Sequence, residues 1–204
     1  MCDKISGMIN SYFWKDLLNK GAVLGLLMSA SAIFEQYAIA YGGTMSWMSA
    51  MGFEYVVSIV VYVWLIYRFA KHFSLQVIDM QKGAKGFSYA QGFLYVVMLS
   101  ILTGVVVGVA TYIFRHFVVG YTEYVEATIR TMQSILKQSQ LPDSVTASYK
   151  QLFAQMASQS EPRIFSVLLS NCWNYMLTGT LLGLVIAGVV KREPQLFNTD
   201  NDAE

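Results

Sequence analysis

The segment from Phe87 to Phe114 reads FSYAQGFLYVVMLSILTGVVVGVATYIF and contains no charged side chain. An uncharged apolar run of about 18 residues or more predicts a helix that crosses a bilayer. A second such run extends from Ile164 to Val190. Of the 204 residues, 55% are hydrophobic and 13% are charged, whereas soluble domains carry about 25% charged residues. We therefore expect an integral membrane protein embedded in the lipid bilayer.

Working outward from these two runs, we expect an all-α membrane protein in which residues 1–204 form a single membrane domain. Four transmembrane helices are predicted, at about residues 19–41, 47–67, 87–114 and 164–190. The turn-forming residues Gly42, Gly43 and Thr44 separate the first two spans. The start of the second span stays open between Trp47 and Phe53.

The residues before the first span admit two interpretations. One helical face collects the apolar side chains Ile5, Met8, Ile9, Tyr12, Phe13 and Leu17. This face is typical of a short helix lying in the membrane interface, but it also fits a first span that simply begins earlier. Ala30, Ser31 and Ala32 resemble a signal-peptide cleavage site. Because the apolar run continues beyond them, we expect an uncleaved first span.

Lysine and arginine are distributed unevenly between the segments that connect the spans. With the N-terminus inside, the inner segments hold Lys4, Lys15, Lys20, Arg68, Lys71, Lys82, Lys85, Lys191 and Arg192. The first outer loop holds none, and in the long outer segment 115–163 acidic residues alternate with the basic ones. This bias predicts a multi-pass membrane protein with both termini in the cytoplasm. The formal net charge of +1 gives no indication of nucleic-acid binding.

Segment 121–158 is more polar than the spans and repeats apolar residues at helical spacing. The first repeat comprises Tyr121, Tyr124, Val125, Thr128, Ile129, Met132, Ile135 and Leu136, and the second comprises Val145, Tyr149, Leu152, Phe153 and Met156. Pro142 and Asp143 break the pattern between them. We expect an outer hairpin of two amphipathic helices, each burying its stripe, with Leu152 packed inside. The hairpin is either a spacer or a docking element for a partner.

Three spans carry small residues at four-residue spacing, which lets helix backbones approach closely. These helix-packing positions are Gly21, Gly25 and Ser29 in the first span, Gly104 and Gly108 in the third, and Gly179 and Gly183 in the fourth. We therefore expect a tightly packed helical bundle. Whether the stripes face one another or a second copy of the chain stays open.

No catalytic motif occurs in the sequence: there is no HExxH, P-loop, GxSxG or helix-opening GxGxxG pattern. The only two histidines, His72 and His116, fall on opposite sides of the membrane in the predicted topology, each beside a basic neighbour. Cys2 and Cys172 have no paired spacing, so neither a disulfide nor a zinc site is indicated. We predict no enzyme activity, no metal and no cofactor.

A family resemblance rests on residues that mark the ends of the spans. They are Phe13-Trp14-Lys15 followed by Gly21 and Gly25, then Phe87-Ser88-Tyr89-Ala90-Gln91-Gly92-Phe93, and finally the run from Gly179 to Arg192. Over about residues 10–192 the chain resembles the bacterial membrane family called domain of unknown function 4199. The resemblance implies four spans with an insertion between the third and the fourth, and it implies no activity. It also suggests an association with membrane glycosyltransferases that act on lipid-linked sugars.

Two acidic residues interrupt the first two spans. At about 1.5 Å per residue, Glu35 and Glu54 each lie about 21–22 Å from the inner edge of a core about 30 Å thick. Other polar residues near this level are Gln36, Thr103, Asn171, Asn174 and Thr178. Charges inside spans are costly and commonly functional. We expect Glu35 to be buried in the bundle with Glu54 within reach, as a structural polar cluster or as a site for a proton, a cation or a polar head group. In a third interpretation Glu54 sits in the interface.

Three functions fit this pattern. The first is a non-catalytic membrane subunit that acts as an accessory or assembly partner of another membrane protein, favoured by the small-residue stripes and the outer hairpin. The second is a small oligomeric transporter or channel that uses the intramembrane acids. The third, a membrane enzyme acting on lipids, requires a nucleophile or metal cluster that we do not find. We expect a membrane-protein partner in the first case and a homo-oligomer in the second.

Overall fold

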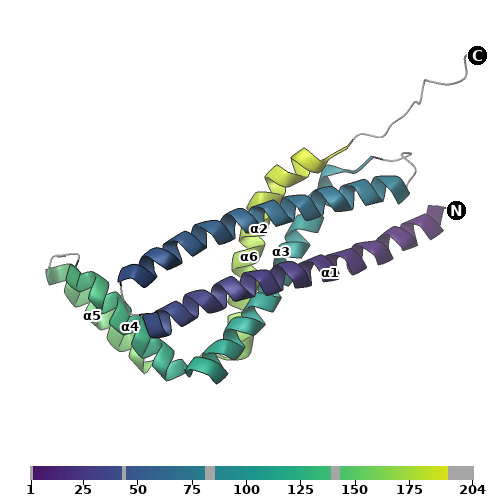
Figure 1. Ribbon diagram of the computed structural model, residues 1–204. Helices are drawn as coiled ribbons and strands as arrows, with labels where there is room; N and C mark the ends of the chain where they lie inside the picture. The colour runs from purple at the N-terminus through teal and green to yellow at the C-terminus, as the bar shows by residue number, and fades with distance from the viewer. Residues whose placement is uncertain (1, 43–44, 81–85, 139–142, 193–204) are drawn as a thin grey trace, which may run out of the picture.

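Figure 1 shows the computed structural model, which describes residues 2–42, 45–80, 86–138 and 143–192. The longest helices are α1 (Cys2–Tyr37), α2 (Met45–Met80), α3 (Tyr89–Ile113) and α6 (Ile164–Val190). Two shorter helices, α4 (Tyr121–Gln138) and α5 (Asp143–Ser158), lie between α3 and α6 in the sequence. Short π-helical segments, η1 (Ala38–Gly42) and η2 (Phe114–Val119), continue α1 and α3. The described residues form no strand, and the predicted all-α class is confirmed.

Four of these helical stretches are long and apolar enough to cross a membrane: Ser11–Tyr41, Met51–Met80, Tyr89–Val119 and Ile164–Val190. The predicted number of spans and the insertion between the third and the fourth are therefore confirmed. The N-terminal residues continue directly into α1, so the structure favours a longer first helix over a separate interfacial one. The second helix also runs well beyond the predicted end at Tyr67. Arg68 and Lys71 end the apolar run, but both are good helix formers and do not end the helix.

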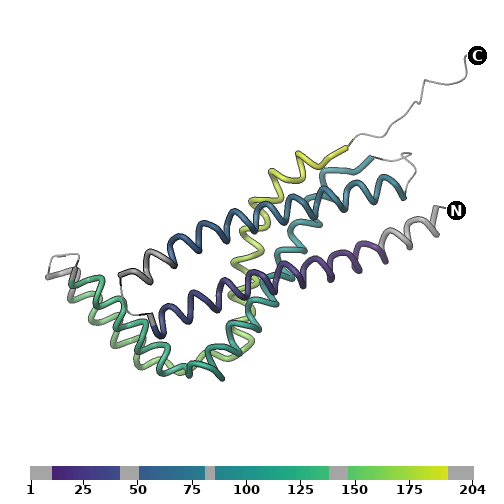
Figure 2. The backbone as a smooth tube through the Cα atoms, in the orientation of Figure 1, coloured from purple at the N-terminus to yellow at the C-terminus, as the bar shows by residue number. Residues whose placement is uncertain are grey.

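Helix α3 is the centre of the bundle, and α6 and α1 pack closely against it. The α3–α6 pair is antiparallel over its whole length, since Gly92 lies near Ala187 at one end and Gly108 lies near Leu168 at the other. The α1–α3 pair is parallel, with Gly21 against Leu102 and Gly25 against Val106. Figure 2 traces α3 and α6 side by side from the end where α3 begins and α6 ends to the end that carries α4 and α5. We call these the terminal end and the hairpin end.

Every predicted small-residue stripe is used within the chain. A Cβ atom added to Gly104 would lie 2.9 Å from the Asn171 carbonyl oxygen and 3.0 Å from the Cys172 Cα, so α6 backbone occupies the space that a side chain would need. Gly179 and Gly183 lie against the side chains of Ser100 and Phe93 of α3. In α1, the buried Ser29 hydroxyl donates to the Gly25 carbonyl at 2.7 Å. The stripes thus bring the α3 and α6 backbones into contact, and in α1 they make room for α3 side chains.

Helix α2 packs more loosely than the other three spans. It offers no glycine stripe to its neighbours, and a Cβ added to Gly52 would meet nothing within 4 Å. Its central contact is Tyr62, which is buried, donates to Ser100 of α3 at 3.0 Å and meets the Tyr175 ring of α6 edge-on. A cavity lies between α2, α1 and α6.

Aromatic packing and a short backbone pairing close the terminal end. The Phe73 and Tyr95 rings stack with centroids 4.3 Å apart, and Phe13 and Phe87 pack edge-on against Phe73. Phe87 and Arg192 exchange backbone hydrogen bonds of 2.9 and 3.0 Å, which fasten the start of α3 to the end of α6.

The segment between α3 and α6 forms the predicted helical hairpin (Figure 1). Gly120, with φ of 85°, lets the chain turn from η2 into α4, because this left-handed conformation is strained for other residues. Helix α4 packs against η1, η2 and α5, so the hairpin rests on the ends of α1 and α3. Ala127 and Phe153 are buried, but Leu152 is 45% exposed. The prediction of a packed Leu152 is therefore wrong, because α5 turns Phe153 inward instead. The predicted break at Pro142 lies outside the described residues.

Candidate functional site

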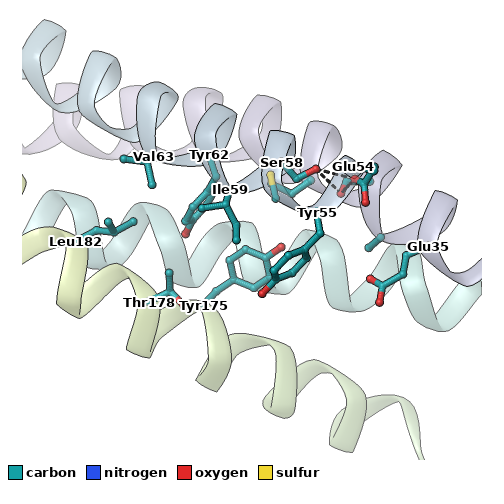
Figure 3. A pocket seen from close by; sticks show the side chains of 13 residues that line it. Glu35, Glu54, Tyr55, Ser58, Ile59, Tyr62, Val63, Tyr175, Thr178 and Leu182 are labelled. Carbon is teal, nitrogen blue, oxygen red and sulfur yellow. Dashed lines mark hydrogen bonds between the residues drawn. The ribbon is translucent and has the colours of Figure 1, made fainter. Parts of the chain in front are cut away.

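The cavity between α1, α2 and α6 has a volume of about 350 Å³ (Figure 3). We call it the glutamate pocket, because Glu35 of α1 and Glu54 of α2 both line it. Its other lining residues are Met28, Ser31 and Ala32 of α1, Tyr55, Ser58, Ile59, Tyr62 and Val63 of α2, and Tyr175, Thr178 and Leu182 of α6. Of the polar residues singled out in the sequence, Glu35, Glu54 and Thr178 thus meet at one place.

Glu54 is half-buried and its carboxylate is held by serine hydroxyls from two helices. The Ser58 hydroxyl donates to Glu54 Oε1 at 2.6 Å from one turn further along α2. The Ser31 hydroxyl of α1 donates to the same oxygen, and the two serine oxygens are 2.8 Å apart. The two hydrogen bonds hold Oε1 of Glu54 between α1 and α2. The second carboxylate oxygen, Oε2, takes part in neither of them. Glu54 is therefore a positioned group of the pocket.

Glu35 is exposed, and the expectation that it is buried in the bundle is wrong. It lies at the rim of the pocket, where it accepts no hydrogen bond from the described residues but is close enough to Tyr175 for an electrostatic interaction. The physical reason for its exposure is the loose packing of α2, which does not close over this part of α1. Figure 3 shows the Glu35 and Glu54 side chains on the same side of the Tyr55 and Tyr175 rings.

A second cavity of about 340 Å³ adjoins the glutamate pocket towards the hairpin end. Glu35, Glu54 and Tyr55 line both cavities, so the two acids stand at the junction between them. Helix α4 contributes Thr128, Thr131, Met132 and Ile135 to this second cavity. The hairpin therefore takes part in shaping the surroundings of the acids.

The remaining predicted polar residues lie elsewhere and do not join the pocket. Gln36 is buried and its Oε1 accepts from Arg115 Nε at 3.4 Å, linking α1 to η2. Thr103 is buried and donates to its own helix at Leu99, and Asn171 does the same at Val167. Asn174 is exposed. Since Thr103 and Asn171 bind backbone one turn away, they do not link spans to one another.

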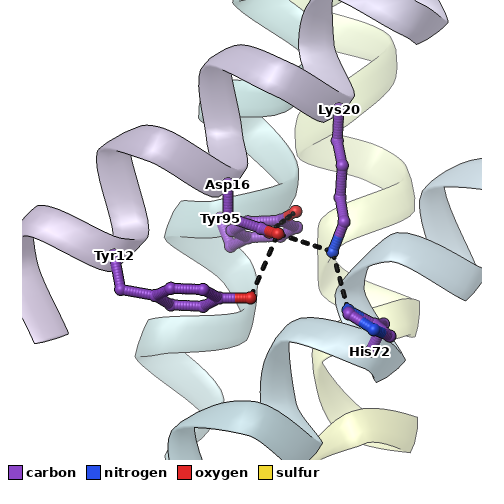
Figure 4. A network of polar contacts seen from close by, with 5 residues as sticks. All are labelled: Tyr12, Asp16, Lys20, His72 and Tyr95. Carbon is purple, nitrogen blue, oxygen red and sulfur yellow. Dashed lines mark hydrogen bonds and ion pairs between the residues drawn. The ribbon is translucent and has the colours of Figure 1, made fainter.

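A polar network at the terminal end went unnoticed in the sequence (Figure 4). Asp16 of α1 is buried, and its carboxylate accepts from the hydroxyls of Tyr12 at 3.2 Å and Tyr95 at 2.7 Å. Lys20 forms an ion pair with Asp16 at 2.8 Å, and its ammonium donates to His72 Nδ1 at 2.9 Å. The network joins α1, α2 and α3. The i,i+4 spacing of Tyr12, Asp16 and Lys20 was the available signal.

The two histidines lie at opposite ends of the bundle, and each contacts a residue distant in sequence. His72 meets Lys20 at the terminal end, whereas His116 pairs with Glu161 at 2.7 Å at the hairpin end. The polar contacts of the two histidines are therefore with Lys20 and Glu161 and not with the basic neighbours Lys71 and Arg115. Within the part of the chain that the structure describes, no three His, Cys, Asp or Glu side chains gather as metal ligands.

These features define an all-α protein with four helices suited to spanning a membrane and an acid-lined cavity between three of them. Residues 19–192 match the model of the family described as Protein of unknown function (DUF4199), and the chain belongs to that family. Comparison with curated proteins and with solved structures finds no match.

Proposed function

We propose that this protein is a non-catalytic integral membrane subunit that assembles with another membrane protein. The observation that carries this proposal is the α4–α5 hairpin, which is anchored to the bundle through α4 and presents apolar side chains on its surface. On α5, Tyr149 is 38% exposed and Leu152 is 45% exposed, and Met132 of α4 is 37% exposed. Apolar groups exposed outside the spans favour an interaction surface.

The anchoring of the hairpin supports a docking role over a spacer role. A spacer needs only to connect α3 to α6, whereas α4 packs on η1 and η2 and buries Ala127. Arg115 reinforces this base, with its guanidinium 4.5 Å from the centroid of the Tyr124 ring. A hairpin held in a set orientation presents its free face with little further ordering cost on binding.

The location and topology form part of the same proposal. The basic residues at the terminal end favour an orientation with both termini in the cytoplasm and the hairpin outside. The family resemblance favours the bacterial cytoplasmic (inner) membrane as the location. The family resemblance favours a membrane glycosyltransferase acting on lipid-linked sugars as the partner.

Thiol labelling of whole cells tests the topology. Single cysteines at Ser139 and Gln195, two positions outside the described residues, are placed in a chain without Cys2 and Cys172 and probed with an impermeant thiol reagent. The proposal expects labelling at position 139 and none at position 195. The reverse pattern would refute it.

Affinity purification from native membranes in mild detergent tests the assembly role. The proposal expects a second membrane protein in stoichiometric amount, and Leu152→Glu should release it while the variant still elutes as a folded species. Gln151→Glu is the matched control, since it adds the same charge at an exposed position about 100° away around α5. Recovery of the protein alone, or equal loss of the partner from both variants, would contradict the proposal.

A small oligomeric transporter or channel is the second candidate. The observation that favours it is that Glu35 and Glu54 line one cavity inside the membrane-spanning region. Purification as a homo-oligomer without a second protein would support this candidate over the first.

A further inference from the structure

We propose that the glutamate pocket is a binding site for the ammonium group of a single-chain amphiphile, with the hydrocarbon chain lying along the apolar wall of the pocket. This inference goes beyond the proposed assembly role and does not depend on it.

The first argument is charge. Two carboxylates from different helices line the pocket, and no basic side chain lines it. Arg115, which contacts Gln36 next to Glu35, also contacts the Tyr124 ring and lines neither cavity. A carboxylate at this depth in a membrane is costly unless a proton or a cation neutralises it. A bound ammonium ion would interact with both acids and neutralise one of their two negative charges.

The second argument is the geometry of the acids and the aromatic rings. Ser31 and Ser58 both bind Glu54 Oε1, which orients the carboxylate and leaves Oε2 for another donor. The Tyr55 and Tyr175 rings lie beside the acids (Figure 3), whereas the Tyr62 hydroxyl is occupied with Ser100. Carboxylates together with aromatic faces are the groups that recognise ammonium ions in proteins.

The third argument distinguishes an organic cation from a bare metal ion. Hard cations such as Ca²⁺ take 6–8 oxygen ligands, commonly from several carboxylates, and among the described residues no three His, Cys, Asp or Glu side chains gather as metal ligands. The pocket, at about 350 Å³, is also large for a single ion and falls within the range of about 300–1,000 Å³ typical of organic ligands. Met28, Ala32, Ile59, Val63 and Leu182 supply an apolar wall for a hydrocarbon chain.

The fourth argument is access. The rim residues Glu35, Tyr55 and Ile59 are exposed although they lie in membrane-spanning helices. The pocket therefore opens sideways between α1, α2 and α6, where an amphiphile can enter from the bilayer. The loose packing of α2 is what leaves this side open.

Photolabelling of the full chain in phosphatidylcholine nanodiscs tests the site. The probe is an alkylamine with a twelve-carbon chain that carries a diazirine, and the matched probe is the alcohol of the same length. We expect the amine to label peptides around Ser31, Ser58 and Tyr175 saturably and about tenfold more strongly than the alcohol, since a tenfold difference needs only about 1.4 kcal/mol of charge recognition.

Variants and competitors separate the charge from the cavity. The Glu35→Gln/Glu54→Gln double variant should lose about tenfold in labelling, whereas Glu123→Gln, an exposed acid on α4, should leave labelling unchanged. Ile59→Trp, which fills the cavity and keeps both acids, should also abolish labelling, so the result does not rest on one variant folding. Monodisperse elution and helical circular dichroism check each variant.

The outcomes that would overturn the proposal are distinct. Equal labelling by the amine and the alcohol would show that the pocket binds the hydrocarbon chain without recognising the ammonium group. Competition by n-butylamine as effective as that by n-dodecylamine would assign the site to a soluble amine and refute the amphiphile. Unchanged labelling of the double variant would show that the acids do not recognise the probe.

Discussion

Replacing Gly104 by alanine should separate the two most closely packed helices of the bundle. The added Cβ would stand 2.9 Å from the Asn171 carbonyl oxygen and 3.0 Å from the Cys172 Cα. Both are backbone atoms of α6, so no side-chain rotation relieves the contact and the whole helix must move. Gly188→Ala is the control, because a Cβ at Gly188 would meet nothing within 4 Å.

The magnitude follows from two opposing effects. Overpacking of a tight contact costs about 1–3 kcal/mol, and alanine regains about 0.5–1 kcal/mol over glycine inside a helix. The net expectation for Gly104→Ala is a loss of about 1 kcal/mol, within a range of about 0–2.5 kcal/mol. Gly188→Ala carries only the second effect and should be neutral or stabilising by about 0.5 kcal/mol.

Unfolding in mixed micelles of dodecyl maltoside and dodecyl sulfate, followed by far-ultraviolet circular dichroism, measures this difference. The Gly104→Ala midpoint should shift to a lower dodecyl sulfate fraction, and the Gly188→Ala midpoint should not. Equal midpoints for the two variants would refute the conclusion that α6 backbone lies against Gly104.

Three further predictions concern other contacts of the fold. Asp16→Leu should cost about 3–5 kcal/mol in the same unfolding assay, because it leaves Lys20 without its ion-pair partner and strands two tyrosine hydroxyls; a shift no larger than that of Gly104→Ala would argue against a buried network. Phe153→Ala should open the hairpin and speed its proteolysis, costing about 3–5 kcal/mol locally, whereas the half-exposed Leu152 replaced by alanine should change the rate little; equal rates would show that Phe153 is not packed. Gly120→Ala should cost about 1–2 kcal/mol by forcing alanine into a left-handed conformation, and an unchanged proteolysis rate at the η2–α4 turn would contradict this.

Much of the fold was predictable because it depends on residues close together in the sequence. Long uncharged runs such as Phe87–Phe114 identify spans because only such runs are stable in the apolar core of a bilayer. The helical spacing of apolar residues identifies the hairpin helices. The small-residue spacing also showed which helices can approach closely, although not which neighbour each would meet. The end of α2 was misjudged for a local reason: charge ends an apolar run without ending a helix, so hydropathy underestimated its length.

The candidate site was predictable only in part, because a site depends on which helices meet. Glu35 and Glu54 could be identified because placing an acidic side chain inside a span costs free energy. Ser31 and Ser58 carry no such signal in the sequence, and their role is visible only where α1 and α2 meet at Glu54. The Asp16 network likewise needs Tyr95 of α3 and His72 of α2 beside α1.

The sequence by itself therefore determined the helical class, the four spans, the hairpin and the family. Tertiary structure decided the exposure of Glu35 and the existence of the glutamate pocket. Both depend on how loosely α2 packs against α1 and α6. That packing depends on the side chains of three helices at once. No single helix carries this information, because a cavity is the volume that its neighbours together fail to fill.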